Sequence, residues 1–189
     1  MKLDTNKYWN DRYVNGGNSG NGSYGKLAEY KAKFINDFID TNEINSLLEY
    51  GCGDGNQLSL IKCKKIFAFD ISEKALSLCK QRVNCETFSK FEDIKEVPEL
   101  ILSLDVIYHL VNDIDYNGYM ANLVGLGAKY LIVYSPNEEM EGMAAHVRPR
   151  NFTKDITGYT LKLKEINPFK SLDHKQGSFS DFYVYEKNS

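Results

Sequence analysis

The chain has 189 residues, of which 42% are hydrophobic and 26% are charged, so it is long and apolar enough to build a globular core. This composition is close to the average for soluble proteins, which excludes a disordered, collagen-like or coiled-coil chain. Twenty-three basic and 26 acidic residues leave a formal net charge of −3 and a pI near 5.7, whereas nucleic-acid-binding domains usually show a pI above about 9. We therefore expect no nucleic-acid partner.

The sequence shows no motif for secretion, for a membrane span or for a metal site. The sequence starts without the apolar stretch of a secretion signal, and no apolar run approaches the roughly 18 residues that cross a membrane. The four cysteines form no Cys-x-x-Cys pair, and the three histidines are scattered. These features predict a cytoplasmic protein with free thiols, no membrane span and no metal site.

The first distinctive segment is a glycine-rich loop over residues 15–25, which holds five of the fourteen glycines. An aromatic-rich stretch precedes it, and a helix follows in which apolar residues recur every three or four positions, at Leu27, Tyr30, Phe34 and Phe38. A loop held on both sides is favoured as a lid over a ligand, with a plain surface loop as the alternative. We expect a single domain over residues 1–189, with a lid loop plus helix in 1–40 and a core in 41–186.

Short apolar strands and amphipathic helices alternate through the middle of the chain. Strands are expected at 46–50, 66–70, 86–88, 100–104 and 130–134, and helices at 57–62, 72–83 and 116–126. Continuous apolar strands separated by helices predict a parallel sheet that is covered on both faces. The tail instead alternates polar and apolar residues at 160–166 and 181–186, with a break at 176–178, which predicts an antiparallel hairpin at the edge of the sheet.

The most informative segment follows the first expected strand and reads Glu49-Tyr-Gly-Cys-Gly-Asp-Gly55. Glycines directly after a buried strand let backbone N–H groups approach a ligand, and a following helix offers its N-terminus to a negative group. A dinucleotide site would need Gly-x-Gly-x-x-Gly, but here the third glycine comes one position early. Asp70 ends the second strand, where a carboxylate can accept both hydroxyls of a ribose.

Three motifs in order resemble those of the class I S-adenosylmethionine-dependent methyltransferases. They are the acid and three glycines of residues 49–55, Asp70 followed by Ile-Ser-Glu, and Leu-Asp-Val-Ile-Tyr-His-Leu at 104–110. The resemblance covers residues 45–186. It implies a Rossmann-like α/β fold with a seven-stranded, mostly parallel sheet, a C-terminal antiparallel hairpin and helices on both faces. It also implies S-adenosylmethionine as cofactor and S-adenosylhomocysteine as product.

The resemblance assigns roles to residues at the ends of the strands. Glu49 and Asp105 are expected near the cofactor's ammonium, and Asp70 at its ribose. Ile71 is expected beside the adenine, and Asp93 is the candidate for the acid that meets the adenine. The full set expected to bind the cofactor is Trp9, Arg12, Tyr24, Glu49, Gly51, Cys52, Gly53, Gly55, Gln57, Asp70, Ile71, Ser72, Asp93, Leu104 and Asp105.

Methyl transfer is an in-line displacement, so most catalysis comes from holding the acceptor against the methyl carbon, and an alcohol acceptor also needs a base. His109 is the first candidate base and His146 the second, with a structural histidine as the alternative for each. If the chain is helical after Asp105, His109 lies on the same face four residues later. Tyr108, Arg148 and Arg150 are candidates for substrate binding, since two guanidiniums could hold a phosphate or carboxylate, although a solvated loop is the alternative.

The overall pattern also resembles small bacterial methyltransferases of capsule and lipopolysaccharide gene clusters. That resemblance implies an O-methyltransferase whose partner is a small-molecule acceptor, a nucleotide-linked or polymer sugar or its phosphate-type decoration. The alternatives are methylation of another small molecule, a protein or RNA, and a binding module that holds a nucleoside without chemistry. A metal-assisted sugar methyltransferase is less favoured, because no metal-ligand spacing supports it.

Overall fold

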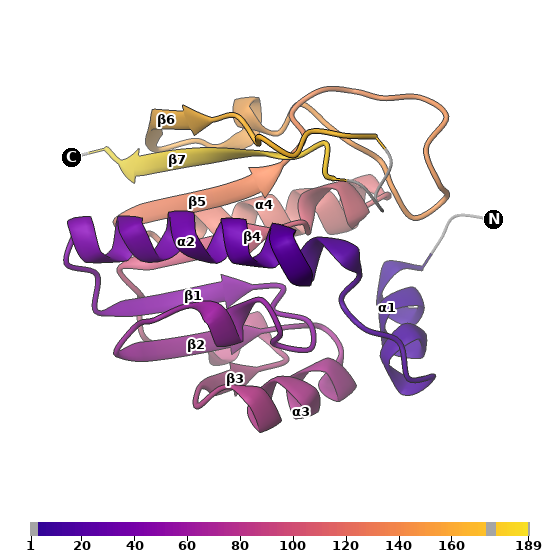
Figure 1. Ribbon diagram of the computed structural model, residues 1–189, viewed down its shortest axis with the longest axis horizontal. Helices are drawn as coiled ribbons and strands as arrows, with labels where there is room; N and C mark the ends of the chain where they lie inside the picture. Colours follow the sequence, from indigo (N-terminus) through magenta and orange to yellow (C-terminus); the bar gives the residue numbers. More distant parts are fainter. Residues whose placement is uncertain (1–3, 173–176, 189) are drawn as a thin grey trace.

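The computed structural model describes residues 4–172 and 177–188. Its centre is a seven-stranded sheet in the order β3-β2-β1-β4-β5-β7-β6 (Figure 1). The first five strands are parallel, β7 runs antiparallel to β5, and β6 pairs antiparallel with β7 at the edge. The strands are β1 (Ser46–Tyr50), β2 (Lys65–Phe69), β3 (Glu86–Phe88), β4 (Leu100–Leu104), β5 (Tyr130–Ser135), β6 (Tyr159–Glu165) and β7 (Asp181–Lys187). The expected sheet and its antiparallel hairpin are confirmed.

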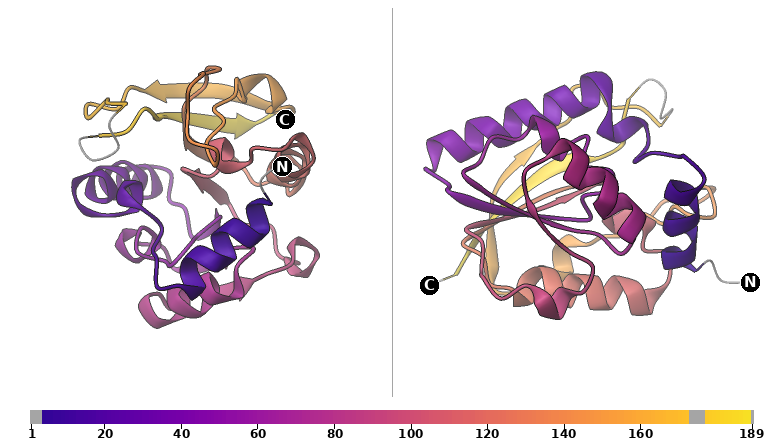
Figure 2. Two further views of the ribbon diagram at one scale, coloured as in Figure 1. Left: turned by 90° about the vertical axis from the view of Figure 1, so that its right-hand side faces the viewer. Right: turned by 90° about the horizontal axis from the view of Figure 1, so that it is seen from below.

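Helices cover both faces of the sheet, as Figures 1 and 2 show. The α-helices are α1 (Thr5–Val14), α2 (Gly25–Thr41), α3 (Glu73–Arg82) and α4 (Asp113–Gly125). On one face, apolar residues of α2 and α3 pack on the sheet, and on the other face α4 does so. Neighbouring residues of one strand therefore belong to different cores: Leu47 packs on the side of α2 and Leu48 on the side of α4. Burial on both faces explains why the parallel strands are continuously apolar.

Side-chain caps set the starts of two helices. Ser72 caps α3, with its hydroxyl accepting from the backbone N–H of Ala75 at 3.3 Å, as the sequence predicted. Asn112 caps α4 by accepting from the N–H of Asp115 at 2.8 Å. This second cap starts α4 three residues before the predicted position, because the apolar pattern begins only after the first turn.

The helix predicted over residues 57–62 is wrong, because the segment forms only one 3-10 turn, Leu58–Leu60, and becomes extended at Ile61. A stretch of about six residues is too short to offset the cost of nucleating an α-helix. The segment that directly follows the glycine turn is therefore not a long helix.

The N-terminal segment contains a helix that the sequence did not predict, because residues 5–14 form α1 ahead of the glycine loop. The Asp4 carboxylate caps this helix by accepting from the N–H of Lys7 at 3.0 Å. Only Thr5 and Tyr13 are buried within the helix, so its apolar periodicity is too weak to show in the sequence. Figure 1 and the left panel of Figure 2 show α1 apart from both faces of the sheet, beyond the carboxyl ends of the parallel strands.

Candidate active site

A cavity of about 650 Å³ lies at the carboxyl ends of β1, β2 and β4, where α1 stands across the edge of the sheet (Figure 1). Its wall comes from segments far apart in the chain: α1, residues 18–23 of the glycine loop, the turn after β1, the segment after β4 and part of α4. Open α/β sheets bind ligands at this edge, because the loops that follow parallel strands meet there. The left panel of Figure 2 looks onto this side of the molecule, with α1 in front.

The cavity brings together most of the residues that the sequence singled out. Its lining includes Trp9, Arg12, Glu49, Gly51, Cys52, Gly53, Asp70, Ile71, Leu104, Asp105, Tyr108, His109 and His146. Other expected site residues lie outside the lining, namely Tyr24, Gly55, Gln57, Ser72, Asp93, Arg148 and Arg150.

Asp70 fastens the glycine turn to the end of β2. Its carboxylate accepts from the backbone N–H groups of Gly53 and Ser72, both at 2.9 Å. Burial raises the pKa of this carboxyl to about 6, although these N–H groups favour its charged form. Gly53 has a φ of +55°, and a Cβ at this position would lie 2.2 Å from the Ser19 hydroxyl oxygen, so no side chain fits between the turn and the glycine loop.

Two backbone N–H groups of the glycine turn donate hydrogen bonds to the neighbouring strand β2. The N–H groups of Gly51 and Cys52 both donate to the carbonyl of Phe69, at 2.8 and 2.9 Å. The expectation that glycine-turn N–H groups face a ligand is therefore not met at these two positions.

Glu49 is a buried acid at the end of β1 that faces the cavity. Its Oε2 has no hydrogen-bond partner among the described residues. Burial raises the pKa of its carboxyl to about 8, while the nearby Lys31 opposes this rise. A buried carboxyl with one unpartnered oxygen is suited to a cationic group that enters the cavity, because such a group would satisfy it.

Asp105, directly after β4, holds several segments together. Its Oδ2 forms an ion pair with the fully buried Lys31 of α2 at 2.7 Å. Its Oδ1 accepts from the hydroxyls of Tyr108 at 3.1 Å and Ser180 at 3.2 Å, and its backbone has a φ of +58°. The sequence carries a sign that Lys31 is buried, because it lies four residues from both Leu27 and Ile35 on the buried face of α2.

His109 ends a 3-10 turn, Ile107–His109, so the condition that the chain is α-helical after Asp105 is not met. Its Nδ1 lies 2.9 Å from the carbonyl oxygen of His146, and a carbonyl only accepts, so Nδ1 carries the proton and Nε2 the lone pair of the neutral ring. Burial lowers the pKa of His109 to about 4, which keeps the ring neutral near pH 7. Trp9 contacts it edge-on with ring centroids 4.8 Å apart, and the ring of His146 stacks at 5.5 Å.

The two arginines expected to bind substrate are engaged elsewhere. Arg148 and Arg150 both pair with Oδ1 of Asp113, at 3.0 and 2.7 Å, and both donate to the carbonyl of Val111. The Arg150 hydrogen bond and the charge of Arg148 lower the pKa of Asp113. Together these contacts attach residues 148–150 to the start of α4.

The remaining expected residues have structural contacts. The Tyr24 hydroxyl donates to Asp54, and the Gln57 amide donates to the carbonyl of Ala28 at 3.2 Å. A Cβ on Gly55 would lie 2.8 Å from Cα of Cys79, so this glycine permits close packing on α3. Asp93 is exposed in the 3-10 turn Phe91–Asp93, so the structure does not bring it to the cavity.

Residues 4–172 and 177–188 show no sign of a metal site or a membrane span. No group of three or more His, Cys, Asp or Glu side chains there is arranged to hold a metal ion. Within the same residues, no helix has the length and apolar character needed to cross a membrane.

Residues 48–116 match the family model described as a methyltransferase domain. The matched stretch contains the glycine turn, Asp70, Asp105 and His109. No curated protein sequence matches the chain.

Solved structures share this methyltransferase fold along nearly the whole chain. The N-methyltransferase NodS from Bradyrhizobium japonicum WM9, in complex with S-adenosylhomocysteine, is 15% identical, with a TM-score of 0.79 over 99% of this chain and 100% of that one. Magnesium protoporphyrin IX methyltransferase from Synechocystis PCC 6803, with bound S-adenosylhomocysteine, is 13% identical, with a TM-score of 0.69 over 98% and 100%. The methyltransferase domain of bacterial CtHen1 is 17% identical, with a TM-score of 0.64 over 85% and 100%. At these identities the similarity shows the fold, and the Rossmann-like methyltransferase fold is confirmed.

Proposed function

We propose that the protein is an S-adenosylmethionine-dependent methyltransferase that transfers the methyl group to an oxygen of a small molecule. The observation that carries the proposal is that Glu49, whose Oε2 has no partner among the described residues, the strand-end acid Asp70 and His109 line one cavity. The methyltransferase-domain match and the neighbours crystallised with S-adenosylhomocysteine support it.

The charges around the cavity fit the zwitterionic methionine end of this cofactor. Glu49 is placed for the ammonium, and Arg12 for the carboxylate. The Arg12 Nε donates to the carbonyl of Asn18 at 2.6 Å, its guanidinium lies 5.6 Å from the Trp9 ring centroid, and no carboxylate among the described residues pairs with it. Asp70 is placed for the ribose, and Ile71, 42% exposed at the cavity wall, for the adenine.

The bound cofactor would supply the reactive methyl group, and residues of this chain would position the acceptor. His109 can take the proton of an acceptor hydroxyl at Nε2, because Nδ1 is fixed on the carbonyl of His146. Trp9 and Tyr108 add flat aromatic surfaces to the same part of the cavity. Since Arg148 and Arg150 are held by Asp113, these contacts favour a ring hydroxyl over a phosphate-type decoration.

The narrower proposal is a sugar acceptor, nucleotide-linked or polymeric, in capsule or lipopolysaccharide biosynthesis. It rests on the sequence resemblance together with this aromatic, base-containing part of the cavity. A cytoplasmic location and a lack of nucleic-acid partners belong to the same proposal, with support from the free cysteines and the net charge of −3.

Calorimetry with S-adenosylhomocysteine, followed by assays of methyl transfer from labelled S-adenosylmethionine to sugars and nucleotide sugars, tests the proposal. We expect binding of S-adenosylhomocysteine and a higher melting temperature, since ligand at 100 times its Kd stabilises the folded state by about 2.7 kcal/mol. Binding without turnover on any acceptor would favour the non-catalytic module, and a gel shift with RNA at low salt would favour RNA. Absence of any binding would contradict the proposal.

A further inference from the structure

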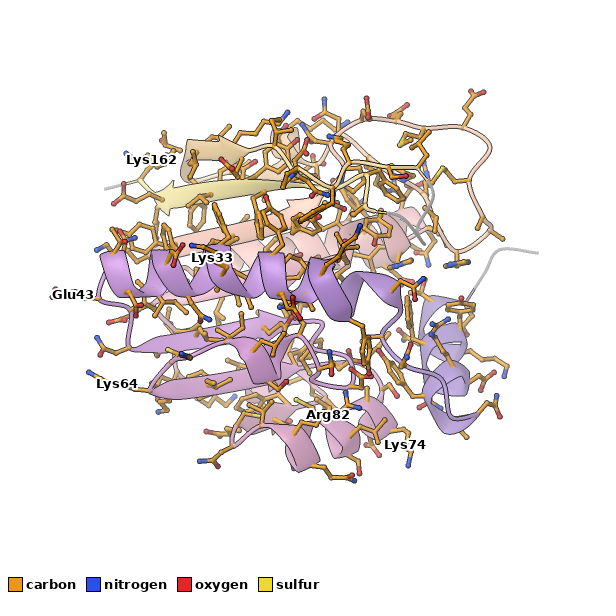
Figure 3. The ribbon with its side chains drawn as sticks, in the orientation of Figure 1. Lys33, Glu43, Lys64, Lys74, Arg82 and Lys162 are labelled. Carbon is orange, nitrogen blue, oxygen red and sulfur yellow. The ribbon has the colours of Figure 1, made fainter. Side chains whose placement is uncertain are left out.

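Asp54, inside the glycine turn, is a buried carboxylate with an unusual number of partners. It is 1% exposed and is not part of the cavity wall. It accepts from the Ser19 hydroxyl at 2.8 Å, the Ser19 N–H at 3.4 Å and the Asn56 N–H at 3.1 Å. The Tyr24 hydroxyl also donates to it, and Arg82 of α3, labelled in Figure 3, pairs with it at 3.3 Å. Burial opposes its charge, but the hydrogen bonds of Tyr24, Asn56 and Ser19 outweigh burial and lower its pKa.

These contacts attach the glycine loop to the turn at both ends. At the first end the bonding is reciprocal, because the N–H of Asp54 donates back to the Ser19 hydroxyl at 3.0 Å. The Tyr13 hydroxyl of α1 lies 3.0 Å from the same oxygen. At the second end, the Asn56 amide donates to the carbonyl of Ser23 at 2.7 Å, next to Tyr24.

The attached loop forms one wall of the cavity. Residues 18–23 line it, and a Cβ on Gly53 would lie 2.2 Å from the Ser19 hydroxyl. A Cβ on Gly22 would lie 3.0 Å from Oδ2 of Asp105. The loop therefore extends from the glycine turn to the end of β4, and the carbonyl of Asn18 within it accepts from Nε of Arg12 at 2.6 Å.

We propose that Asp54 is a positioning residue for the methionine end of the cofactor, acting by holding residues 18–24 as a preformed wall over that end. The inference rests on the proposed function. It replaces the expected lid by a wall that is already in place before the cofactor binds. Opening the loop would break the hydrogen bonds that the Asp54 carboxylate accepts from Ser19 and Tyr24, and hydrogen bonds to a charged group are among the strongest in proteins. Tyr24, expected from the sequence to touch the cofactor, would then act through Asp54.

The test compares two ligands that differ only at the proposed point of action. S-adenosylhomocysteine carries the amino-acid end, and 5′-methylthioadenosine lacks it. Asp54→Asn keeps the shape but puts an amide where the carboxylate accepts from Tyr24 and Arg82. We expect it to weaken S-adenosylhomocysteine binding about 10–30-fold by calorimetry, and methylthioadenosine binding less than about 2-fold.

Tyr24→Phe is the second variant, because it removes one donor to Asp54 and leaves the carboxylate in place. It should weaken S-adenosylhomocysteine binding by about 3–10-fold, again with little effect on methylthioadenosine. Tyr30→Phe is the matched control, since its buried hydroxyl on the neighbouring helix has no hydrogen-bond partner among the described residues. It should leave both affinities unchanged. If Asp54→Asn does not fold, judged by its circular dichroism and melting, Tyr24→Phe against Tyr30→Phe still decides.

Trp9 is the only tryptophan and lines the cavity, so its fluorescence gives the kinetics of both ligands. A preformed wall predicts faster dissociation of S-adenosylhomocysteine in both variants. Equal losses for the two ligands, or no loss in either variant, would overturn the inference while leaving the proposed function intact. A wild-type protein that binds neither ligand would overturn the proposed function first, and the inference with it.

Discussion

The two halves of the cavity are built in different ways. The half that holds Glu49, Gly53 and Asp70 consists of strand ends and the turn between them, positioned by backbone hydrogen bonds within the sheet. The half that holds His109 is assembled by side-chain contacts among α1, the turn after β4 and the segment around His146. We infer that the first half is the stable part of the cavity and would bind the cofactor. The second half would select the acceptor.

Burial shifts the pKa values of the acids in one half and of the histidine in the other half in opposite directions. It raises the pKa of Glu49 to about 8 and that of Asp70 to about 6, and it lowers the pKa of His109 to about 4. In each case the neutral form gains, because burial removes the charged form from water. Near pH 7 the Asp70 carboxyl is therefore mostly ionised, the Glu49 carboxyl is mostly protonated, and the His109 ring is neutral.

The largest expected effect is on the acceptor half. Because His109 would act on the acceptor alone, His109→Ala should lower the rate of methyl transfer by about 10²–10⁴-fold for a hydroxyl acceptor. The affinity for S-adenosylhomocysteine should change less than about 2-fold in calorimetry. His146→Ala, which keeps a backbone carbonyl for Nδ1, is the control and should cost less. Loss of cofactor binding in His109→Ala would show that this residue belongs to the cofactor half.

The second effect is on the cofactor half. Asp70→Ala should weaken S-adenosylhomocysteine binding by about 2–3 kcal/mol, since two ribose hydroxyls lose a charged acceptor. The glycine turn also loses its bond from Gly53, so the melting temperature should fall in the same variant. Unchanged affinity in calorimetry would place the ribose elsewhere.

The third effect is a pH dependence of cofactor binding through Glu49. An ammonium selects the ionised carboxylate, so affinity for S-adenosylhomocysteine should rise between pH 6.5 and 8, by up to about tenfold per unit, and level off above 8. Glu49→Gln and the ligand methylthioadenosine should each remove the slope. A slope that survives in Glu49→Gln would assign the titration to another group.

The same carboxyl affects the stability of the free protein. Its pKa is raised from the ordinary 4.5 to about 8, so its contribution to stability is present below 4.5 and is lost as pH rises through 8. Thermal unfolding of Glu49→Gln should lack this loss.

The smallest expected effect concerns Arg148. Its ion pair with Asp113 is half-exposed, so Arg148→Ala should change stability by less than about 1 kcal/mol. The acceptor KM should also stay within about 2-fold, because the guanidinium lies outside the cavity. Lys33→Ala is the matched control, since Lys33, labelled in Figure 3, forms an exposed pair with Asp37. A tenfold rise in KM confined to Arg148→Ala would show that this arginine binds substrate and belongs to the acceptor half of the cavity.

The sequence by itself determined the parts of the fold that depend on neighbours in the chain. Apolar periodicity located strands as short as β3 (Glu86–Phe88), and Ser72 marked the start of α3. The motif acids Glu49 and Asp70 could be placed in one site because the carboxyl ends of parallel strands share an edge.

Only the tertiary structure decided which distant groups meet. Lys31 pairs with Asp105 across 74 positions, Ser19 with Asp54 across 35, and Arg150 with Asp113 across 37. Local pattern carries no information on such partners, because the sheet order and the packing of α1 and α2 set the distances between them. The sequence shows only that Lys31, Asp105, Asp113 and Arg150 are charged residues. The fold determined that these charges pair with one another, and that His109 lines the cavity.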